Sequence, residues 1–469
     1  MSKKQKFTSA ALVALAAAGG AAVTTSGVAY AQAAPTIQPM NGAPEIRDGQ
    51  QRFKMRGRFQ YDVYSNDWEL DDPTDSASIN GEDGSRSYVR RAFLGVQGRF
   101  TDNWRYKVDF VLSPGAGEAS STLTTTTIAD CNAALAGNQP CVGTASVSTS
   151  GGGDDVAVDD AYLEYAGDFY SVVIGENNIT SPLEDRTSSL DIPFIERSSI
   201  INTYGYGRAA GVAGLVTGAN WMAAVGVYGD SINNADSNFA LDEQISVSGR
   251  FTWAPIFETS PEGVTLLHFG ISGRTRASGD DGGSTQEAFR YRARPLNGRG
   301  SRWVEAGSSA VMERDTSYGF EIAGQYNAFG FTAEYITLEG ESSNDAPQLE
   351  IESHGYYVDL NWSLTGEPRA YRGNQGSFGP IAPANPVSEG GWGHRDISAR
   401  YDFIDLSDID VGGSRGEQTA YAVALNWVPV DHVRFMLNYA STEADRTAGT
   451  ATAGDAEANV ITLRTQFDF

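Results

Sequence analysis

Apolar and polar residues alternate along the last stretch of the chain, from Ala458 to Phe469. Side chains of an extended strand point to opposite faces in turn, so Ile461, Leu463 and Phe467 share one face and mostly polar residues the other. A strand of about ten residues with one apolar and one polar face, ending in an aromatic residue, is typical of a bacterial outer-membrane barrel. Such a strand must pair with the first one, because an open sheet edge is not tolerated in hydrocarbon.

The same alternation recurs along most of the chain, with Gly, Asn, Asp or Pro between the alternating stretches. Long connections follow the odd-numbered stretches and short ones the even-numbered, which places the amino-terminus at the periplasmic end. We therefore predict an all-β fold, a closed antiparallel transmembrane β-barrel of about sixteen strands. The predicted strands cover residues 51–65, 86–100, 104–112, 156–165, 169–175, 207–216, 221–229, 241–253, 264–274, 317–326, 331–336, 354–362, 396–405, 419–427, 432–439 and 458–469.

Charged residues of these stretches gather on one face. Trp104, Tyr106, Val108 and Phe110 alternate with charged residues. A charge at the bilayer midplane costs about 2 to 4 kcal/mol, so the charged face must line the lumen. A soluble β-sandwich would also alternate, but it does not explain the aromatic carboxy-terminus or the exported amino-terminus. The periodicity does not account for the long Gly/Pro-rich connection 363–394, which falls where a short periplasmic turn is expected.

The amino-terminus has the features of a secretory signal. Lys3, Lys4 and Lys6 precede an apolar run over residues 10–22, and a small-x-small site ends at Ala31. The apolar run is too short for a membrane anchor. We predict a signal peptide over residues 1–31, a polar periplasmic lead-in over 32–50 and the barrel over 51–469.

Composition agrees with an exported channel and excludes other classes. The 469 residues include 53 Gly, 21 Tyr and 21 Phe and carry a net charge of −25, which is too acidic for general nucleic-acid binding. Cys131 and Cys141 are the only cysteines, and in an oxidising compartment we expect them to form a small surface disulfide. A metal-binding cysteine pair is the weaker alternative, because no His lies near them.

Four cations lie on the lumen face of the first strand. Arg52, Lys54, Arg56 and Arg58 are each separated by about 7 Å, which makes a ladder of positive charge. Guanidinium groups are permanently charged, and their donors match phosphate or carboxylate oxygens. We predict an ion pathway that also includes Arg91, Arg105, Lys107 and Arg464.

Two other interpretations of these cations remain open. Acidic lumen residues such as Asp62, Asp109 and Glu321 could pair with them and stiffen the wall. Alternatively, a basic wall could face acids across the lumen, which would give a general porin with a transverse field and little ion preference.

Residues 176–206 do not alternate. This segment follows the fifth strand, where a loop either folds inward and narrows the pore or lies on the outer surface, and the local residues do not decide between the two. Arg186 and Arg197 are our candidates for the constriction if the loop folds inward. The acidic outer segments at 67–83, 280–281 and 405–410 lack calcium-loop spacing, so we expect solvated loops and no metal site there.

Several stretches resemble one known family, the phosphate-selective porins O and P. They are residues 89–98 (VRRAFLGVQG), 160–165 (DAYLEY), 174–176 (IGE), 194–198 (FIERS), 355–358 (GYYV), 364–367 (LTGE), 399–402 (ARYD), 425–427 (LNW) and 436–439 (MLNY). The resemblance implies a sixteen-stranded, trimeric outer-membrane channel with an arginine and lysine ladder for phosphate or other anions. It also implies that 176–206 is the constriction loop and that the long 364 segment is a family feature. The strong acidity of this chain departs from that pattern.

The predicted function is passive diffusion of small anions, including inorganic phosphate, across the outer membrane, without a cofactor. The expected partners are outer-membrane lipid, lipopolysaccharide and two further copies of the chain. An enzyme is the rival class, but the four histidines are scattered and no nucleophile elbow, zinc-binding histidine pair or phosphate loop is present in the sequence. A plugged barrel that anchors a surface layer is a third class, and conductance would separate it from a porin.

Overall fold

The computed structural model describes most of the chain in a series of ordered segments. These are residues 36–70, 84–112, 121–123, 147–149, 156–234, 244–260, 263–277, 289, 291–299, 302–306, 312–342, 350–408, 414–448 and 455–469. The predicted signal peptide and the predicted disulfide between Cys131 and Cys141 lie outside the described residues.

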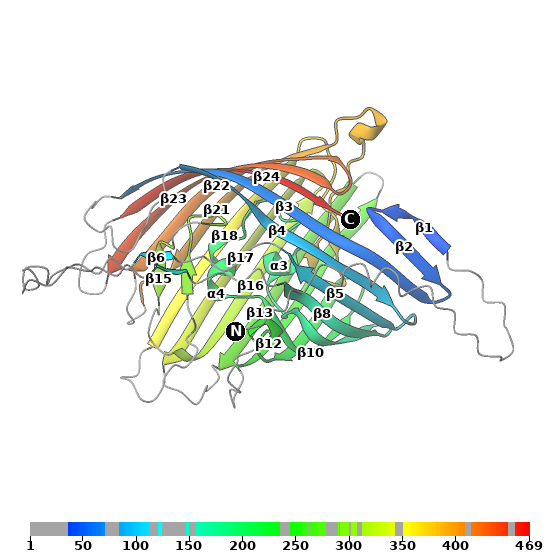
Figure 1. Cartoon of the computed structure of the whole chain (residues 1–469), viewed down its shortest axis with the longest axis horizontal. Coiled ribbons are helices and arrows are strands. Elements are labelled where there is room, and N and C mark those ends of the chain that lie inside the picture. The colour runs from blue at the N-terminus through cyan, green and yellow to red at the C-terminus, as the bar shows by residue number, and fades with distance from the viewer. Residues whose placement is uncertain are drawn as a thin grey trace, which may run out of the picture.

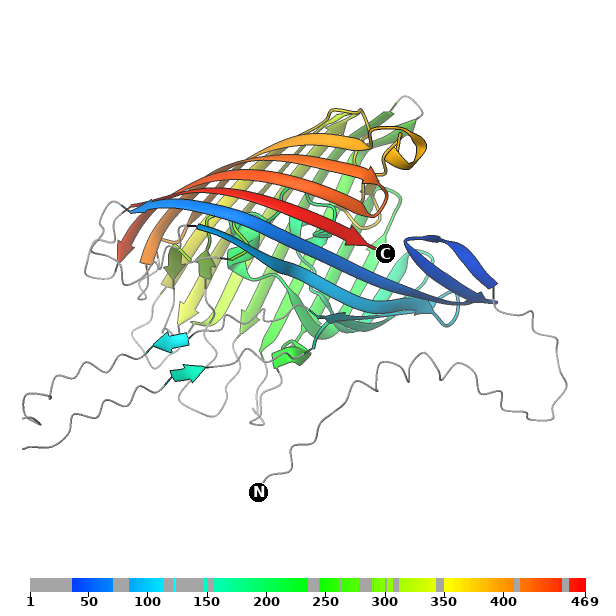
Figure 2. The ribbon, with the colours of Figure 1, turned by 45° about the horizontal axis from the view of Figure 1, so that its top comes forward.

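Sixteen antiparallel strands form a closed barrel (Figures 1 and 2). The last strand closes against the first, from the pair Ala456 and Leu70 to the pair Asp468 and Arg58. The barrel predicted from the alternation is confirmed. Its strands are β3 (Gln51–Leu70), β4 (Gly84–Arg99), β5 (Trp104–Val111), β8 (Ala157–Ala166), β9 (Tyr170–Asn178), β10 (Arg208–Thr217), β11 (Trp221–Tyr228), β12 (Ile245–Ser260), β13 (Gly263–Ala277), β16 (Met312–Tyr326), β17 (Phe329–Ser342), β18 (Glu350–Ser363), β21 (His394–Asp405), β22 (Ser414–Val430), β23 (Val433–Ala448) and β24 (Ala456–Asp468).

The alternation of side chains sets the two faces of the wall. In β24 the outward Ile461 and Leu463 are 49% and 52% exposed, whereas the inward Thr462 and Arg464 are buried. Outward apolar side chains remain exposed because lipid, which is absent from the isolated chain, covers them in a membrane. Most strands are joined by short turns at one end of the barrel and by longer connections at the other.

The predicted polar lead-in forms a β-hairpin at the short-turn end. It consists of β1 (Thr36–Asn41) and β2 (Ala43–Asp48), and β2 pairs with β3 from Asp48 and Gln51 to Glu45 and Lys54. β24 covers the same edge of β3 only as far as Arg58. The hairpin therefore continues the pairing of an edge that would otherwise expose backbone groups, and it lies beside the carboxy-terminus (Figure 2).

Small elements fill part of the barrel or decorate its ends. They are α3 (Leu183–Arg186), α4 (Ser199–Tyr204), the 3₁₀ turns η2 (Ile232–Asn234) and η3 (Val387–Glu389), and the two-stranded pairs β6 (Ser121–Leu123) with β7 (Val147–Thr149), β14 (Tyr291–Ala293) with β15 (Val304–Ala306), and β19 (Tyr371–Arg372) with β20 (Ser377–Phe378). Across the described ranges, every helix is too short or too polar to span a bilayer.

Candidate functional site

The connection between β9 and β10, residues 179–207, folds back into the barrel and carries α3 and α4 (Figure 1). The Leu183 N–H donates to Glu321 Oε2 at 2.8 Å and to Glu334 Oε2 at 2.9 Å. The Glu184 N–H donates to Glu334 Oε1 at 2.7 Å. These wall carboxylates accept the N–H groups that the first turn of a helix leaves without a partner. Of the two placements left open for this segment, the structure shows the inward one, and we call it the constriction loop.

Arginines of the last strands fasten the rest of the constriction loop. Arg464 of β24 donates to the Ile195 carbonyl at 2.7 Å, and Arg434 of β23 donates to two loop carbonyls at 2.9 Å. Arg400 of β21 donates to the Glu184 carboxylate at 2.5 Å. Each of these side chains is almost fully buried. A loop with this many charge-assisted contacts is held against one side of the wall.

Arg464, which we predicted on the ion pathway, is instead enclosed between wall and loop. Its guanidinium donates to both carboxylate oxygens of Asp62, each at 2.7 Å, and both side chains are fully buried. It is not among the residues that line the open cavity described below. Its place is that of an anchor, because the buried carboxylate and the loop carbonyl use its donors.

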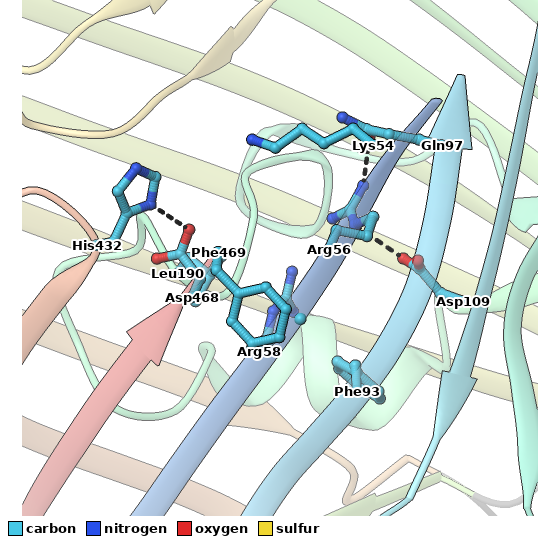
Figure 3. A pocket seen from close by; sticks show the side chains of 11 residues that line it. Lys54, Arg56, Arg58, Phe93, Gln97, Asp109, Leu190, His432, Asp468 and Phe469 are labelled. Atoms are coloured by element: carbon cyan, nitrogen blue, oxygen red, sulfur yellow. Dashed lines mark hydrogen bonds and ion pairs between the residues drawn. The ribbon is translucent and has the colours of Figure 1, made fainter. Parts of the chain in front are cut away.

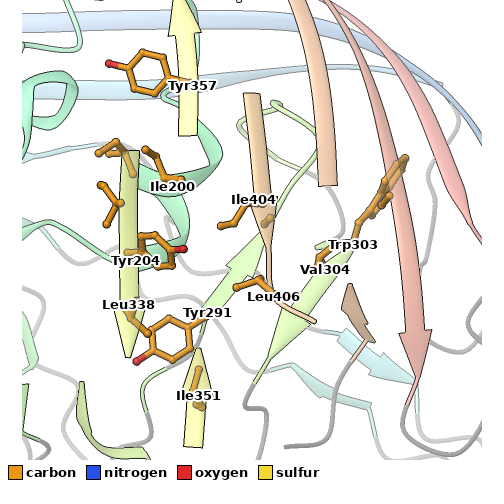
Figure 4. Close-up of a cluster of buried hydrophobic side chains, with 14 of the residues drawn as sticks. Ile200, Tyr204, Tyr291, Trp303, Val304, Leu338, Ile351, Tyr357, Ile404 and Leu406 are labelled. Carbon is orange, nitrogen blue, oxygen red and sulfur yellow. The ribbon is translucent and has the colours of Figure 1, made fainter. Parts of the chain in front are cut away.

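A second segment enters the lumen at the long-connection end. Tyr291 of β14 and Val304 of β15 pack with Ile200 and Tyr204 of α4 in a buried hydrophobic cluster that extends to Leu338 of β17 (Figure 4). An apolar core inside a channel excludes water from that side of the lumen. The open path must therefore lie elsewhere in the cross-section.

The long segment 363–394 enters from the short-turn end, which accounts for its length. Its β19–β20 hairpin places Tyr371 and Phe378 in a buried cluster with Leu183 of the constriction loop. The Tyr371 hydroxyl lies 2.6 Å from His268 Nδ1 on β13. Two insertions from opposite ends of the barrel thus meet in the lumen and narrow it together.

A cavity of about 950 Å³ is lined by the constriction loop, by residues of the 363–394 segment, and by strands β3 to β5, β8 to β12 and β21 to β24. Ten Arg or Lys side chains and eight Asp or Glu side chains line it, a positive excess in a chain whose net charge is −25. The cations are Arg56, Arg58, Arg91, Lys107, Arg186, Arg197, Arg208, Arg250, Arg372 and Arg434; the acids are Asp159, Asp160, Glu164, Asp185, Asp191, Asp396, Asp431 and Asp468.

Five of the ten cations have no carboxylate oxygen within 4.0 Å among the described residues. Arg58 donates to the hydroxyls of Ser189 at 2.9 Å and Ser188 at 3.4 Å, and Arg91 donates to the Gln60 amide oxygen at 2.9 Å. Neutral acceptors position a guanidinium without cancelling its charge, so these groups can still attract an anion. We call the five the cavity arginines: Arg58, Arg91, Arg186, Arg372 and Arg434.

The predicted ladder on β3 lies on the lumen face, and its members differ in surroundings. Arg52 stands at one end, 3.6 Å from a glutamate of β2. Lys54, Arg56 and Arg58 line a smaller pocket of about 170 Å³ next to the carboxy-terminus (Figure 3). Arg56 is paired with Asp109 at 3.3 Å. Only Arg56 and Arg58 of the four also reach the larger cavity.

The remaining predicted residues are divided between the cavity and its surroundings. Arg105 has a side chain that is 53% exposed, lies 3.9 Å from Glu164 and does not line the cavity. Arg186 and Arg197 of the constriction loop both do. Arg197 is 3.6 Å from Asp185 and donates to loop carbonyls, so it also braces the loop. The structure thus brings Arg56, Arg58, Arg91, Lys107, Arg186 and Arg197 to one cavity.

Comparison with known proteins identifies the family. Residues 53–469 match the profile of the family described as phosphate-selective porin O and P. The chain belongs to that family. This porin is accordingly a protein of the bacterial outer membrane, as the sequence predicted.

Relatives of this porin are distant in sequence. An uncharacterized protein of Caulobacter vibrioides is 28% identical over 87% of this chain and 71% of its own length. Porin O of Pseudomonas aeruginosa is 24% identical over 98% of this chain and 97% of its own. Among solved structures, the trimer form of OmpT from Vibrio cholerae covers 89% of this chain and 99% of its own with 13% identity and a TM-score of 0.49. An anion-selective porin from Comamonas acidovorans covers 89% and 100% with 9% identity and a TM-score of 0.47.

A β-bulge turns one arginine of this porin into the lumen, although strict alternation would place it in lipid. Pairing of β4 with β3 passes from Arg91 directly to Val89, so Arg90 is an extra residue and also faces inward. Its Nε donates to Glu196 of the constriction loop at 2.8 Å. The sequence signal was two adjacent arginines within a membrane strand, because one would otherwise be in hydrocarbon.

A second β-bulge turns an acidic residue into the lumen. Pairing of β8 with β5 skips Asp159, which therefore faces inward together with Asp160. Their carboxylates and that of Asp109 lie within 4.8 Å of one another, an arrangement that could hold a metal ion. Arg208 pairs with both Asp159 and Asp160 at 2.9 Å, and Lys107 pairs with Asp109 at 3.2 Å. Because side-chain cations already neutralise this cluster, its donor set does not fit a metal site.

Arginines at the long-connection end were also missed. The β14–β15 hairpin carries them inside the lumen, and the guanidinium of Arg299 lies over the Tyr88 ring at 4.9 Å. The signal was a local excess of one residue type in a segment that does not alternate. These residues are Arg292, Arg294, Arg299 and Arg302.

Proposed function

We propose that this porin is a passive diffusion channel that prefers small anions, inorganic phosphate among them, and that it uses no cofactor. The observation that supports this is the set of cavity arginines, none of which has a carboxylate oxygen within 4.0 Å among the described residues. Forked guanidinium donors match the oxygens of phosphate and carboxylate. Several such sites of moderate strength in series allow an ion both to enter and to leave.

The arrangement supports a path along the barrel. Arginines of the β14–β15 hairpin lie towards the long-connection end, and Arg91 and Arg186 line the cavity. Arg372 belongs to the hairpin that enters from the short-turn end and lines the same cavity. An anion would shed part of its water and pass from one cationic group to the next.

A general porin with little ion preference is the second candidate. It is favoured by the eight acids of the same cavity, which face its ten cations. If their field dominates, the lumen holds a transverse field and passes both signs of charge.

The zero-current potential of the purified protein in a planar bilayer under a potassium chloride gradient distinguishes the two. We expect the sign of anion flow, and we expect added phosphate to block the chloride current. A potential near zero or of cation sign, without phosphate block, would support the general porin instead.

We also propose the assembly and processing that the sequence predicted. The functional unit is a homotrimer in contact with outer-membrane lipid and lipopolysaccharide, and the mature chain begins at Gln32 after removal of residues 1–31. Light scattering of the detergent complex gives the number of chains. Intact-mass measurement of the protein from outer membranes gives its amino-terminus.

A further inference from the structure

Strands β10 and β11 are almost free of charged side chains. Residues 209–228, which span nearly all of both strands and their turn, contain no charged side chain. The outward Val212 and Val225 are 51% and 57% exposed, as expected for lipid-facing positions. Inward positions of a water-filled barrel are normally polar. Here the inward positions are apolar as well.

These inward side chains form a continuous apolar strip. Val173 of β9 is paired with Ala213 of β10, and Leu215 of β10 is paired with Ala224 of β11. All four line the 950 Å³ cavity and are only half-buried. We call Val173, Ala213, Leu215 and Ala224 the apolar strip.

The constriction loop covers only one edge of this part of the wall. Ile179 at the start of the loop packs with Ala209 and Tyr228. The barrel-wall arginines that bond to the loop are on β3, β4, β13, β21, β23 and β24, and none in the described part of the chain is on β10 or β11. Ala213 also packs against this cluster, whereas Val173, Leu215 and Ala224 belong to no buried cluster of the described residues and line the cavity.

The arginines that flank the apolar strip are already paired with acids. Arg250 of β12, in register with Ala224, pairs with Glu321 at 2.6 Å, and Arg208, which begins β10, pairs with Asp159 and Asp160 at 2.9 Å. Arg58, Arg91 and Arg186 line the same cavity without a carboxylate partner. One cavity thus offers guanidinium groups and a hydrocarbon surface together. A tetrahedral inorganic anion uses only the first, and a nearby apolar wall costs it hydration.

We propose that the solutes of this channel include organic anions with a short apolar body, monocarboxylates above all. The carboxylate pairs with the cavity arginines while the hydrocarbon chain lies along the apolar strip. This inference rests on the proposed anion channel and adds the chemical class of its solute. Contact with the strip removes apolar surface of the solute from water, which favours longer chains.

The test uses acetate, butyrate and hexanoate as blockers of the chloride current at pH 7, with a porin-free bilayer as background. A methylene that is half covered by the strip improves affinity about twofold, so hexanoate should block about sixteenfold more tightly than acetate. An affinity that is independent of chain length in the wild-type channel would overturn the inference.

Substitutions then locate the effect. Val173→Thr and Leu215→Asn place polar groups on the strip and should flatten the dependence on chain length. Val460→Thr is the matched control, because Val460 is a lumen-side valine of β24 that does not line the cavity. A dependence that survives both strip substitutions would also overturn the inference.

The two proposals fail in different ways. A zero-current potential of anion sign with no chain-length dependence refutes the apolar-strip inference and leaves the anion channel standing. A potential of cation sign refutes both.

Discussion

Replacing Arg464 with Met removes the buried charge that holds the constriction loop to the barrel wall. The guanidinium donates to both oxygens of Asp62 and to the Ile195 carbonyl, each at 2.7 Å, and lies 3.4 Å from the Glu196 carboxylate. Met has a similar length and fills much of the same space. The substitution therefore tests the charge and the hydrogen bonds more than the packing.

The loss of stability expected for Arg464→Met follows from the burial of its partner, Asp62. Asp62 is fully buried, and without Arg464 both of its oxygens lose their guanidinium donor. Removing one member of a buried ion pair typically destabilises a protein by about 3 to 5 kcal/mol, because the remaining charge has no compensation. We expect that loss in the free energy of unfolding, together with a more mobile constriction loop, since Ile195 loses its donor.

Unfolding in urea, followed by tryptophan fluorescence in detergent, measures the stability. Arg105→Met is the control, because its side chain is exposed and its pair with Glu164 is long at 3.9 Å. Exposed pairs are worth about 0 to 1 kcal/mol. Single-channel recording should show larger and noisier currents for Arg464→Met only.

The reasoning would be refuted by one combination of results. If Arg464→Met unfolds within 1 kcal/mol of the control while its anion preference falls, then Arg464 acts on the ion pathway and does not anchor the loop. A double replacement with Asp62→Asn should recover part of the lost stability, because the buried carboxylate is then neutral.

Three further predictions concern the cavity, the carboxy-terminus and the long connection. Arg58→Gln should lower the anion-to-cation permeability ratio about fivefold, because one charge at 4 Å in water is worth about 1 kcal/mol. The control Arg105→Gln should leave the zero-current potential unchanged. Equal shifts of that potential in the two variants would exclude a special role for the cavity. Gly57→Ala should reduce the folded fraction on unheated SDS gels, because the new Cβ would lie 2.2 Å from the Phe469 ring. Such overpacking typically destabilises a protein by about 1 to 3 kcal/mol. A wild-type gel pattern would contradict this prediction. Burial raises the pKa of Glu367, but hydrogen bonds from its neighbours outweigh burial and lower that pKa from 4.5 to about 2. The stabilisation from its charge is therefore complete above pH 4.5 and is lost as the pH falls through 2. Pepsin cleavage of segment 364–393, normalised at each pH to cleavage of an unfolded substrate, should be faster at pH 2 than at pH 4 in the wild type. The normalised rates should be similar at the two pH values in Glu367→Gln, and a wild-type ratio in the variant would refute this.

The constriction loop illustrates what the local sequence could not predict. A non-alternating segment after the fifth strand was evident, but only the family resemblance implied its direction. The local residues did not, because the groups that hold the segment inward lie far along the chain. Glu321 and Glu334 accept the N–H groups of α3, and Arg400 binds Glu184 from a strand more than two hundred residues away. No local pattern encodes such partners.

The sequence by itself determined the barrel, its closure and the side of the wall on which charge lies, since period-two alternation and the cost of charge in lipid act residue by residue. Tertiary structure alone decided which cations remain available to a solute. Arg464 and Arg58 are both lumen-facing arginines by pattern, yet one is enclosed against Asp62 and the other faces the cavity among serine hydroxyls. The β-bulges at Arg90 and Asp159 turn two further charged residues into the lumen, which strict alternation does not predict. The physical reason is that an ion pair depends on the distance between charges from different strands, which only the closed barrel and its inserted loops define.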